Sequence, residues 1–132
     1  MSSPAALPAR RPSVEEMNEH KKNARRYRAE WILGLEAGAL TIADVFEQAD
    51  ESEGAPLLAM RLRDILTALS GSPVKSNRII NQMLQELGVD MKPGNVKVRW
   101  LMDRRSRMRR MVALADVMVR HDRSAPTKAW PW

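Results

Sequence analysis

The chain has 132 residues, a formal net charge of +6 and a sequence pI of about 10.3. This length predicts a single domain, and 44% hydrophobic residues suffice for one modest core. The absence of cysteine excludes disulfides, thiolate zinc sites and cysteine nucleophiles. The positive charge favours a polyanionic partner, nucleic acid or an anionic membrane surface, although a basic surface that is merely solvated is the alternative.

The two ends of the chain look unlike its middle. Residues 1–12 contain three prolines and two arginines and lack the apolar stretch of a signal peptide, so we expect a disordered basic arm. Residues 121–132 contain two prolines and should form a flexible tail. Between them, residues 13–120 should form one helical domain. No apolar run approaches the length of a membrane span, and we expect a cytoplasmic protein.

The first expected element is a long helix over residues 13–37. Ser13 and Glu16 have the spacing of a capping box, and Gly38 should end the helix. Its first half is too polar to bury a broad face. Its second half has one apolar side, formed by Trp31, Ile32 and Leu35. We therefore expect the helix to cross solvent at its start and to dock at its end.

A short helix should follow over residues 42–49. Thr41 is the expected N-cap, with Asp44 at the third helical position. The apolar face consists of Ile42, Val45, Phe46 and Ala49. A local acidic patch consists of Asp44, Glu47, Asp50, Glu51 and Glu53. The patch lacks the Gly-punctuated oxygen spacing of a calcium loop, so a solvated face is the preferred interpretation over a metal site.

Two further helices should surround a turn at residues 70–73, where Ser, Gly and Pro cluster. The first opens at residues 54–56 and has an apolar face of Leu57, Leu58, Leu62, Ile65, Leu66 and Leu69. The second is expected over residues 76–87, closed by Gly88. Its buried face should consist of Ile79, Ile80, Met83, Leu84 and Leu87.

The last expected helix begins after a turn at residues 93–95. Asp103 should cap it, and it should run to about Arg120. Apolar residues recur in it at helical spacing: Met108, Met111, Val112, Ala115 and Met118. The chain holds nine methionines, which we interpret as core filler rather than as a binding surface. No strand pattern and no internal repeat emerges.

The basic residues form two main clusters. The first consists of Lys21, Lys22, Arg25, Arg26 and Arg28. Like charges one turn apart repel each other, and a bound polyanion would relieve that repulsion. The second consists of Lys92, Lys97, Arg99, Arg104, Arg105, Arg107, Arg109 and Arg110. Arginine dominates it, and guanidinium groups match phosphate oxygens bidentately. A helix spreads the last three of these over more than one face.

A smaller basic element lies between the two central helices. Residues 72–78 lead into a helix N-terminus, whose free amides attract anions. Lys75 and Arg78 would flank a phosphate there, and a plain surface turn is the alternative. His20 and His121 have neighbours that suggest neither a triad nor a metal site. We expect no catalysis, no cofactor and no metal.

The chain resembles the small integration host factors of actinobacteria over residues 24–112, and such a copy could be phage-borne. The similarity rests on Arg28-Ala29-Glu30 in a basic helix, on Met60-Arg61-Leu62, on residues 83–89, and on residues 97–104 before the final helix. It implies an all-α fold in which a long N-terminal helix joins a compact helical domain with a helix-two-turns-helix, S13-like element. It also implies a monomeric nucleoid protein that binds and bends duplex DNA with little sequence preference, in recombination or compaction.

The sequence departs from this family at the turn between the central helices. The family has a Gly-Val-Gly-Lys hairpin there, whereas this chain has the longer segment 71–76, in which Gly71 and Lys75 alone match. Contacts could therefore move to Arg78. The expected DNA-binding residues are Arg25, Arg26, Arg28, Lys75, Arg78, Lys97, Arg99, Arg104 and Arg105.

Three other functions stay open. A sequence-specific regulator would read base edges with Asn77, Asn81 and Gln82. An RNA-binding protein would want more aromatic platforms than this chain offers. A DNA glycosylase would need an N-terminal Pro-Glu, which is missing. The ending Trp130-Pro131-Trp132 is either a loose end or a docking peptide for a protein partner. We expect neither a membrane nor a small-molecule substrate as partner.

Overall fold

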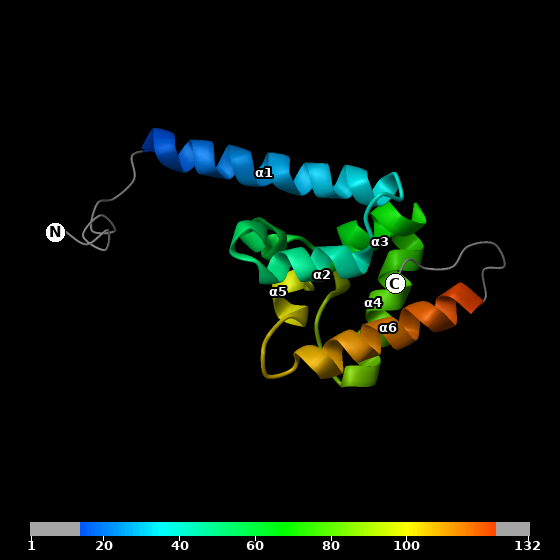
Figure 1. Ribbon diagram of the computed structural model, residues 1–132. Coiled ribbons are helices and arrows are strands. Elements are labelled where there is room, and N and C mark those ends of the chain that lie inside the picture. The colour runs from blue at the N-terminus through cyan, green and yellow to red at the C-terminus, as the bar shows by residue number, and fades with distance from the viewer. Residues whose placement is uncertain (1–13, 124–132) are drawn as a thin grey trace.

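A computed structural model describes residues 14–123 (Figure 1), and the all-α prediction is confirmed. The expected arm, the Ser13 cap and the tail from residue 124 on lie outside the described residues. The elements are α1 (Val14–Glu36), α2 (Ile42–Asp50), the 3-10 helix η2 (Ser52–Ala59), α3 (Leu62–Ser70), α4 (Pro73–Leu87), the 3-10 turn η3 (Pro93–Asn95), α5 (Val98–Leu101) and α6 (Arg107–Arg123).

Helix α1 lies across one side of the domain, and its N-terminal half extends beyond the body (Figure 1). Its 23 residues correspond to about 34 Å of helix. Near its end, Leu35 is buried and Trp31 and Ile32 pack against the core. Gly38, at a φ of +77°, follows the last turn, where few side chains other than glycine are comfortable. The second half of the helix docks as predicted, and its contacts with the domain begin at Tyr27 and Arg28.

Helix α2 begins as predicted. The Thr41 hydroxyl accepts a hydrogen bond from the Asp44 N–H at 3.1 Å, and the Asp44 carboxylate accepts one from the Thr41 N–H at 2.8 Å. All four residues of its expected apolar face are buried. Directly after it, Gly54 is buried so closely that a Cβ there would lie 1.8 Å from the Gln48 carbonyl oxygen. The chain can therefore turn back onto α2 only with a glycine at this position.

The single helix expected to open at residues 54–56 is instead two elements, η2 and α3. Met60 and Arg61 between them are extended, and Arg61 pairs with Lys97 in an isolated antiparallel bridge. The Leu62 N–H donates to the Val96 carbonyl and the Val98 N–H to the Met60 carbonyl, each at 2.9 Å. The helix breaks because its backbone groups bind a segment that is distant in sequence.

Helix α4 begins at Pro73, three residues before the predicted start. Ser72 is the N-cap, and its hydroxyl accepts a hydrogen bond from the Lys75 N–H at 3.2 Å. Proline suits the first helical position because its missing N–H would have no helical partner there. Gly88, at a φ of +68°, ends the helix as predicted. Of its predicted apolar face, Ile79, Ile80, Met83 and Leu84 are buried and Leu87 is partly buried.

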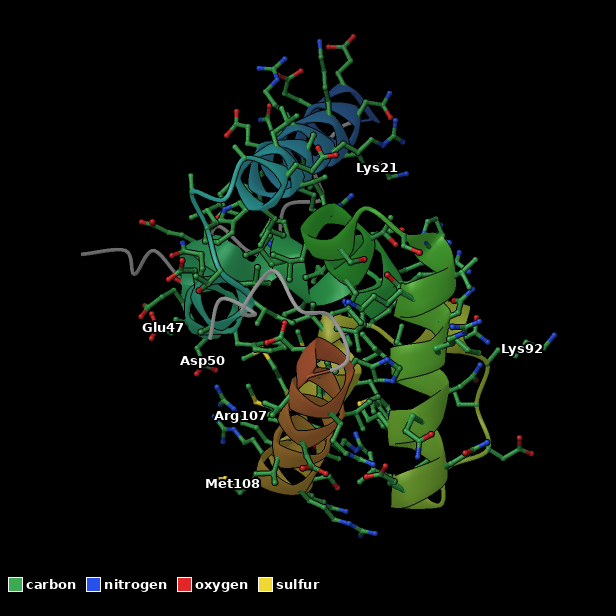
Figure 2. All side chains as sticks on the ribbon, turned by 90° about the vertical axis from the view of Figure 1, so that its right-hand side faces the viewer. Lys21, Glu47, Asp50, Lys92, Arg107 and Met108 are labelled. Carbon is green, nitrogen blue, oxygen red and sulfur yellow. The ribbon has the colours of Figure 1, made fainter. Side chains whose placement is uncertain are left out.

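The final helix differs most from the prediction. The short α5 was not expected, and α6 begins at Arg107 while the Asp103 carboxylate accepts a hydrogen bond from the Arg105 N–H in the preceding turn. Helix α6 lies beside α4 (Figure 2), and it buries Leu114, Val117 and Met118. Met108 is 77% exposed and Val112 is 57% exposed, so the predicted buried face was partly wrong. The helix also continues beyond residue 120, to Arg123.

Candidate nucleic-acid interface

The expected contact zone on α1 is present but uneven. Arg25 and Arg26 are exposed, as are the neighbouring lysines. Lys21 extends outward from this helix in Figure 2. Arg28 is partly buried, and its guanidinium donates to the Pro56 carbonyl of η2 at 3.4 Å. Arg28 therefore helps to fasten α1 to the domain, while Arg25 and Arg26 are available to an external anion.

A second cationic zone lies where the start of α4 meets the end of α6. Arg78 is exposed and Lys75 is partly buried. Burial is the main cause that lowers the pKa of His121 from its ordinary value, and the charges of Lys75, Arg120 and Arg78 lower it further. The predicted pair Lys75 and Arg78 is thus near His121, a residue that is distant in the sequence.

The third expected zone lies around α5. Lys97, Arg99, Arg104 and Arg105 are all exposed. The first two belong to the segment that pairs with residue 61, and the other two lie in the turn before α6. In Figure 1, α1 and α5 lie on opposite sides of α2, so the structure does not bring the α1 zone and the α5 zone into one patch.

Two arginines of the second sequence cluster, Arg107 and Arg110, have partners within the protein, and so does Arg120 farther along α6. Arg107 donates to the Asp50 carboxylate, which lowers the pKa of Asp50 and raises that of Arg107. Arg110 lies over the Trp100 ring at 3.9 Å from its centroid. The pKa of Glu86 is also lowered, chiefly by a hydrogen bond from Arg120. These contacts link α6 to α2, α5 and α4, so all three guanidinium groups already have partners within the protein.

Arg61 and Arg63 are functional candidates that the sequence interpretation missed. The bridge sets Arg61 directly opposite Lys97 at a pair of residues that exchange no hydrogen bond with each other, which is the closer kind of antiparallel pair. Side chains of such a pair lie on the same face. One carboxylate is near: Asp64 is 3.9 Å from the Arg61 Nε, and both side chains are more than half exposed. No local sequence signal predicts this pairing.

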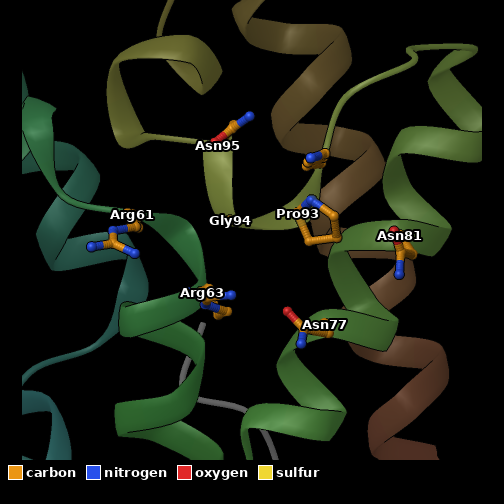
Figure 3. Close-up of a pocket in the computed structure, with 8 residues that line it drawn as sticks. Arg61, Arg63, Asn77, Asn81, Pro93, Gly94 and Asn95 are labelled. Carbon is orange, nitrogen blue, oxygen red and sulfur yellow. The ribbon is translucent and has the colours of Figure 1, made fainter.

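A cleft of about 460 Å³ lies beside this pair, between α3, α4 and the η3 segment (Figure 3). We call it the α3–α4 cleft. Its lining consists of Arg61, Arg63, Asn77, Asn81, Lys92, Pro93, Gly94 and Asn95. Asn95 also lines a neighbouring hollow with Lys97 and Arg99. We call Arg61, Arg63, Lys92, Lys97 and Arg99 the basic band, since they line these two adjoining hollows.

Comparison with known proteins adds no assignment to this geometry. No family model, curated protein sequence or solved structure matches the chain. Among residues 14–123, no three histidine, aspartate or glutamate side chains are grouped to hold a metal ion. No helix in that range combines the length and the apolar character needed to cross a membrane.

Proposed function

We propose that this protein binds duplex DNA through the phosphate backbone, with little sequence preference and without catalysing a reaction. The observation that carries the proposal is the Arg61–Lys97 pair. The backbone holds two cations directly opposite each other, an arrangement that destabilises a bridge, and the exposed Asp64 beside Arg61 offsets it only in part. A row of phosphates would neutralise both.

The distribution of ion pairs supports the same function. Arg107 and Arg120 each bind carboxylates within the domain. Within the described residues, two carboxylates lie near the five cations of the basic band: Asp64 beside Arg61, and Asp103, which lines the second hollow and lies 3.8 Å from the Arg110 guanidinium. Charges that serve only the fold would be matched by acids, as on α6. Release of counterions from DNA would supply most of the binding free energy.

Bending of the DNA follows from the same proposal. Helices α1 and α5 lie on different sides of α2 (Figure 1); α1 carries the exposed Arg25 and Arg26, and Lys97 and Arg99 lie at α5. One duplex that touched both would have to curve around the domain, which costs a few kcal/mol over 20 to 30 base pairs. The resemblance to integration host factors supports this reading, and with it a role in recombination or compaction in the nucleoid.

Duplex DNA is favoured over single strands because the aromatic rings of the described residues are packed. Tyr27 accepts a hydrogen bond from Gln48 at 3.0 Å and lies 6.4 Å from the Trp31 ring centroid. Phe46 is buried, and Arg110 lies over the Trp100 ring, which is partly buried and also lines the second hollow. Recognition of single-stranded nucleic acid usually depends on open stacking platforms.

A sequence-specific regulator is the second candidate, because Asn77 and Asn81 both line the α3–α4 cleft. Asparagine can bind an adenine edge bidentately. Gln82, the third residue considered for base contacts, donates instead to Glu86 at 3.0 Å. The two amides stand beside three cations in this cleft, and this arrangement fits a contact to the phosphate backbone of DNA at least as well as a contact to a base.

The test is a competition at fixed salt concentration. A labelled random-sequence DNA duplex of about 30 base pairs is bound, and unlabelled DNA duplex, RNA duplex or single strand is added. The proposal predicts that any DNA duplex competes equally and that single strands compete poorly. Preferential competition by RNA duplex or by one particular DNA sequence would overturn it in favour of an alternative.

A further inference from the structure

The α3–α4 cleft combines fixed donors from three segments of the chain. Arg61 and Arg63 come from the start of α3, Asn77 and Asn81 from one face of α4, and Lys92 from the segment that leads into η3. In Figure 3 the side chains of Arg63 and Asn77 extend from their helices toward the space between them. Sites assembled from rigid helices hold their donors in place before a ligand arrives.

Gly94 makes room for the Arg63 guanidinium. A Cβ at Gly94 would lie 3.2 Å from the Arg63 Nη1 and 3.5 Å from its Cζ. Gly94 is not among the glycines with positive φ, so its backbone conformation suits other residues as well. Glycine lets the guanidinium lie against the backbone at the edge of the cleft, and a side chain at this position would push it away by a few tenths of an ångström or more.

Asn77 presents an unmatched polar atom. Its Oδ1 is buried and has no hydrogen-bond partner among the described residues. An unpaired buried acceptor costs free energy, and a DNA phosphate, which has no donor, cannot satisfy it in this orientation. Rotation of the side-chain amide by 180° keeps its shape and brings the Nδ2–H₂ donors to the same place. An anion in the cleft would therefore find a neutral donor facing the cations.

The charge of the cleft selects the ligand class. Arg61, Arg63 and Lys92 contribute three positive charges, and Asp64 beside Arg61 offsets one of them. Guanidinium groups bind the tetrahedral oxygens of phosphate bidentately, and lysine adds a point charge. A volume of about 460 Å³ exceeds the needs of a bare phosphate and leaves space for the sugar that carries it.

We propose that the α3–α4 cleft is a discrete phosphate-binding site, with Arg63 as the central donor, Arg61 and Lys92 at its sides and the Asn77 amide at its base. The phosphate belongs to the DNA backbone if the proposed function holds, so this assignment of the source rests on that function. The same chemistry fits the phosphate of a free nucleotide.

The test follows the side-chain N–H signals of Arg63 and Asn77 by NMR in the full chain. Inorganic phosphate is added at constant ionic strength, with sodium chloride as the reference anion. Asn77→Asp is nearly isosteric and places a negative charge in the cleft, and Arg63→Gln removes its central donor. Each should weaken phosphate binding by about tenfold or more, since a hydrogen bond to a charged group is lost. Unchanged thermal melting would show that both variants fold.

Matched controls separate a local site from general electrostatics. Asn23→Asp, at an exposed position of α1, repeats the charge change of Asn77→Asp. Arg109→Gln, at an exposed position of α6, repeats that of Arg63→Gln. Both should leave phosphate affinity within about twofold, a change of under 0.4 kcal/mol. Gly94→Leu keeps the net charge and should still reduce binding, because it crowds Arg63. Equal losses in the cleft variants and the controls, or no phosphate shift at Arg63 and Asn77, would overturn the proposal.

Two further arms identify the source of the phosphate. If it is the DNA backbone, a duplex shifts the same two side-chain signals, and Arg63→Gln weakens duplex binding. If it is a nucleotide, a nucleoside monophosphate binds more tightly than inorganic phosphate, and the variant spares duplex binding. Failure of the wild type to bind any duplex would refute the proposed function. Absence of phosphate-induced shifts at Arg63 and Asn77 would refute the phosphate site alone.

Discussion

Neutralising the Arg61–Lys97 pair should move DNA affinity and stability in opposite directions. Each cation that contacts a phosphate contributes about 0.9 to the slope of log affinity against log salt. The double variant Arg61→Gln, Lys97→Gln should therefore reduce the slope by about 1.8. At 0.1 M salt, each contact corresponds to about 8-fold in affinity, so the loss should be about 60-fold. Fluorescence anisotropy on a random duplex at several salt concentrations measures both quantities.

The same variant should stabilise the free protein. Removing like charges that face each other across a bridge should raise the free energy of unfolding by about 0.5 kcal/mol. This corresponds to a rise of roughly 1 to 3 °C in melting temperature. The ion pair between Arg61 and Asp64 is lost too, but both side chains are more than half exposed, and such pairs contribute little.

The matched control is Arg107→Gln, Arg120→Gln, which removes the same formal charge. Both guanidiniums are bound to carboxylates, so this variant should lose stability and keep its salt slope within about 0.5. The reasoning fails if the control reduces the slope as much as the Arg61, Lys97 variant does. It also fails if that variant melts at a lower temperature than the wild type.

Three further outcomes are expected. Arg99→Ala with Arg104→Ala should weaken binding to all duplexes alike, by up to about 60-fold at 0.1 M salt, and unchanged affinity in anisotropy would remove the α5 zone. The pKa of His121 is lower in the folded protein than in the unfolded chain, so the unfolded chain takes up a proton more readily as the pH falls. Acidification from pH 7.5 to 5.5 should therefore reduce the free energy of unfolding. Bound DNA should raise that pKa, so affinity should increase over the same range, and His121→Gln should remove the increase. Gly54→Ala would place its Cβ against the Gln48 carbonyl, and denaturant unfolding should show a loss of about 1 to 3 kcal/mol.

Local signals predicted the elements whose ends depend on nearby residues. The Thr41 cap and the glycines that follow α1 and α4 were identified because capping chemistry acts within a few positions. The break at Met60 and Arg61 was missed because it depends on hydrogen bonds to a segment that is distant in sequence. Helical periodicity by itself would carry the helix through this point.

The orientation of α6 could not be predicted from periodicity, because both of its faces carry apolar residues. Packing against α4 buries Leu114 and Val117, and leaves Met108 and Val112 exposed. The basic residues show the same limit. Exposed Arg99 stands in a run of basic residues, whereas Arg63 stands in the mixed-charge segment Arg61-Leu62-Arg63-Asp64, and the fold alone brings it into a cleft.

The central claim is tested most directly by a salt titration of the wild-type chain on a random-sequence duplex of about 30 base pairs. We expect binding whose log affinity falls with log salt at a slope of about −3 to −8, as for several neutralised phosphates. Absence of binding at low salt, or affinity that does not depend on salt, would contradict it.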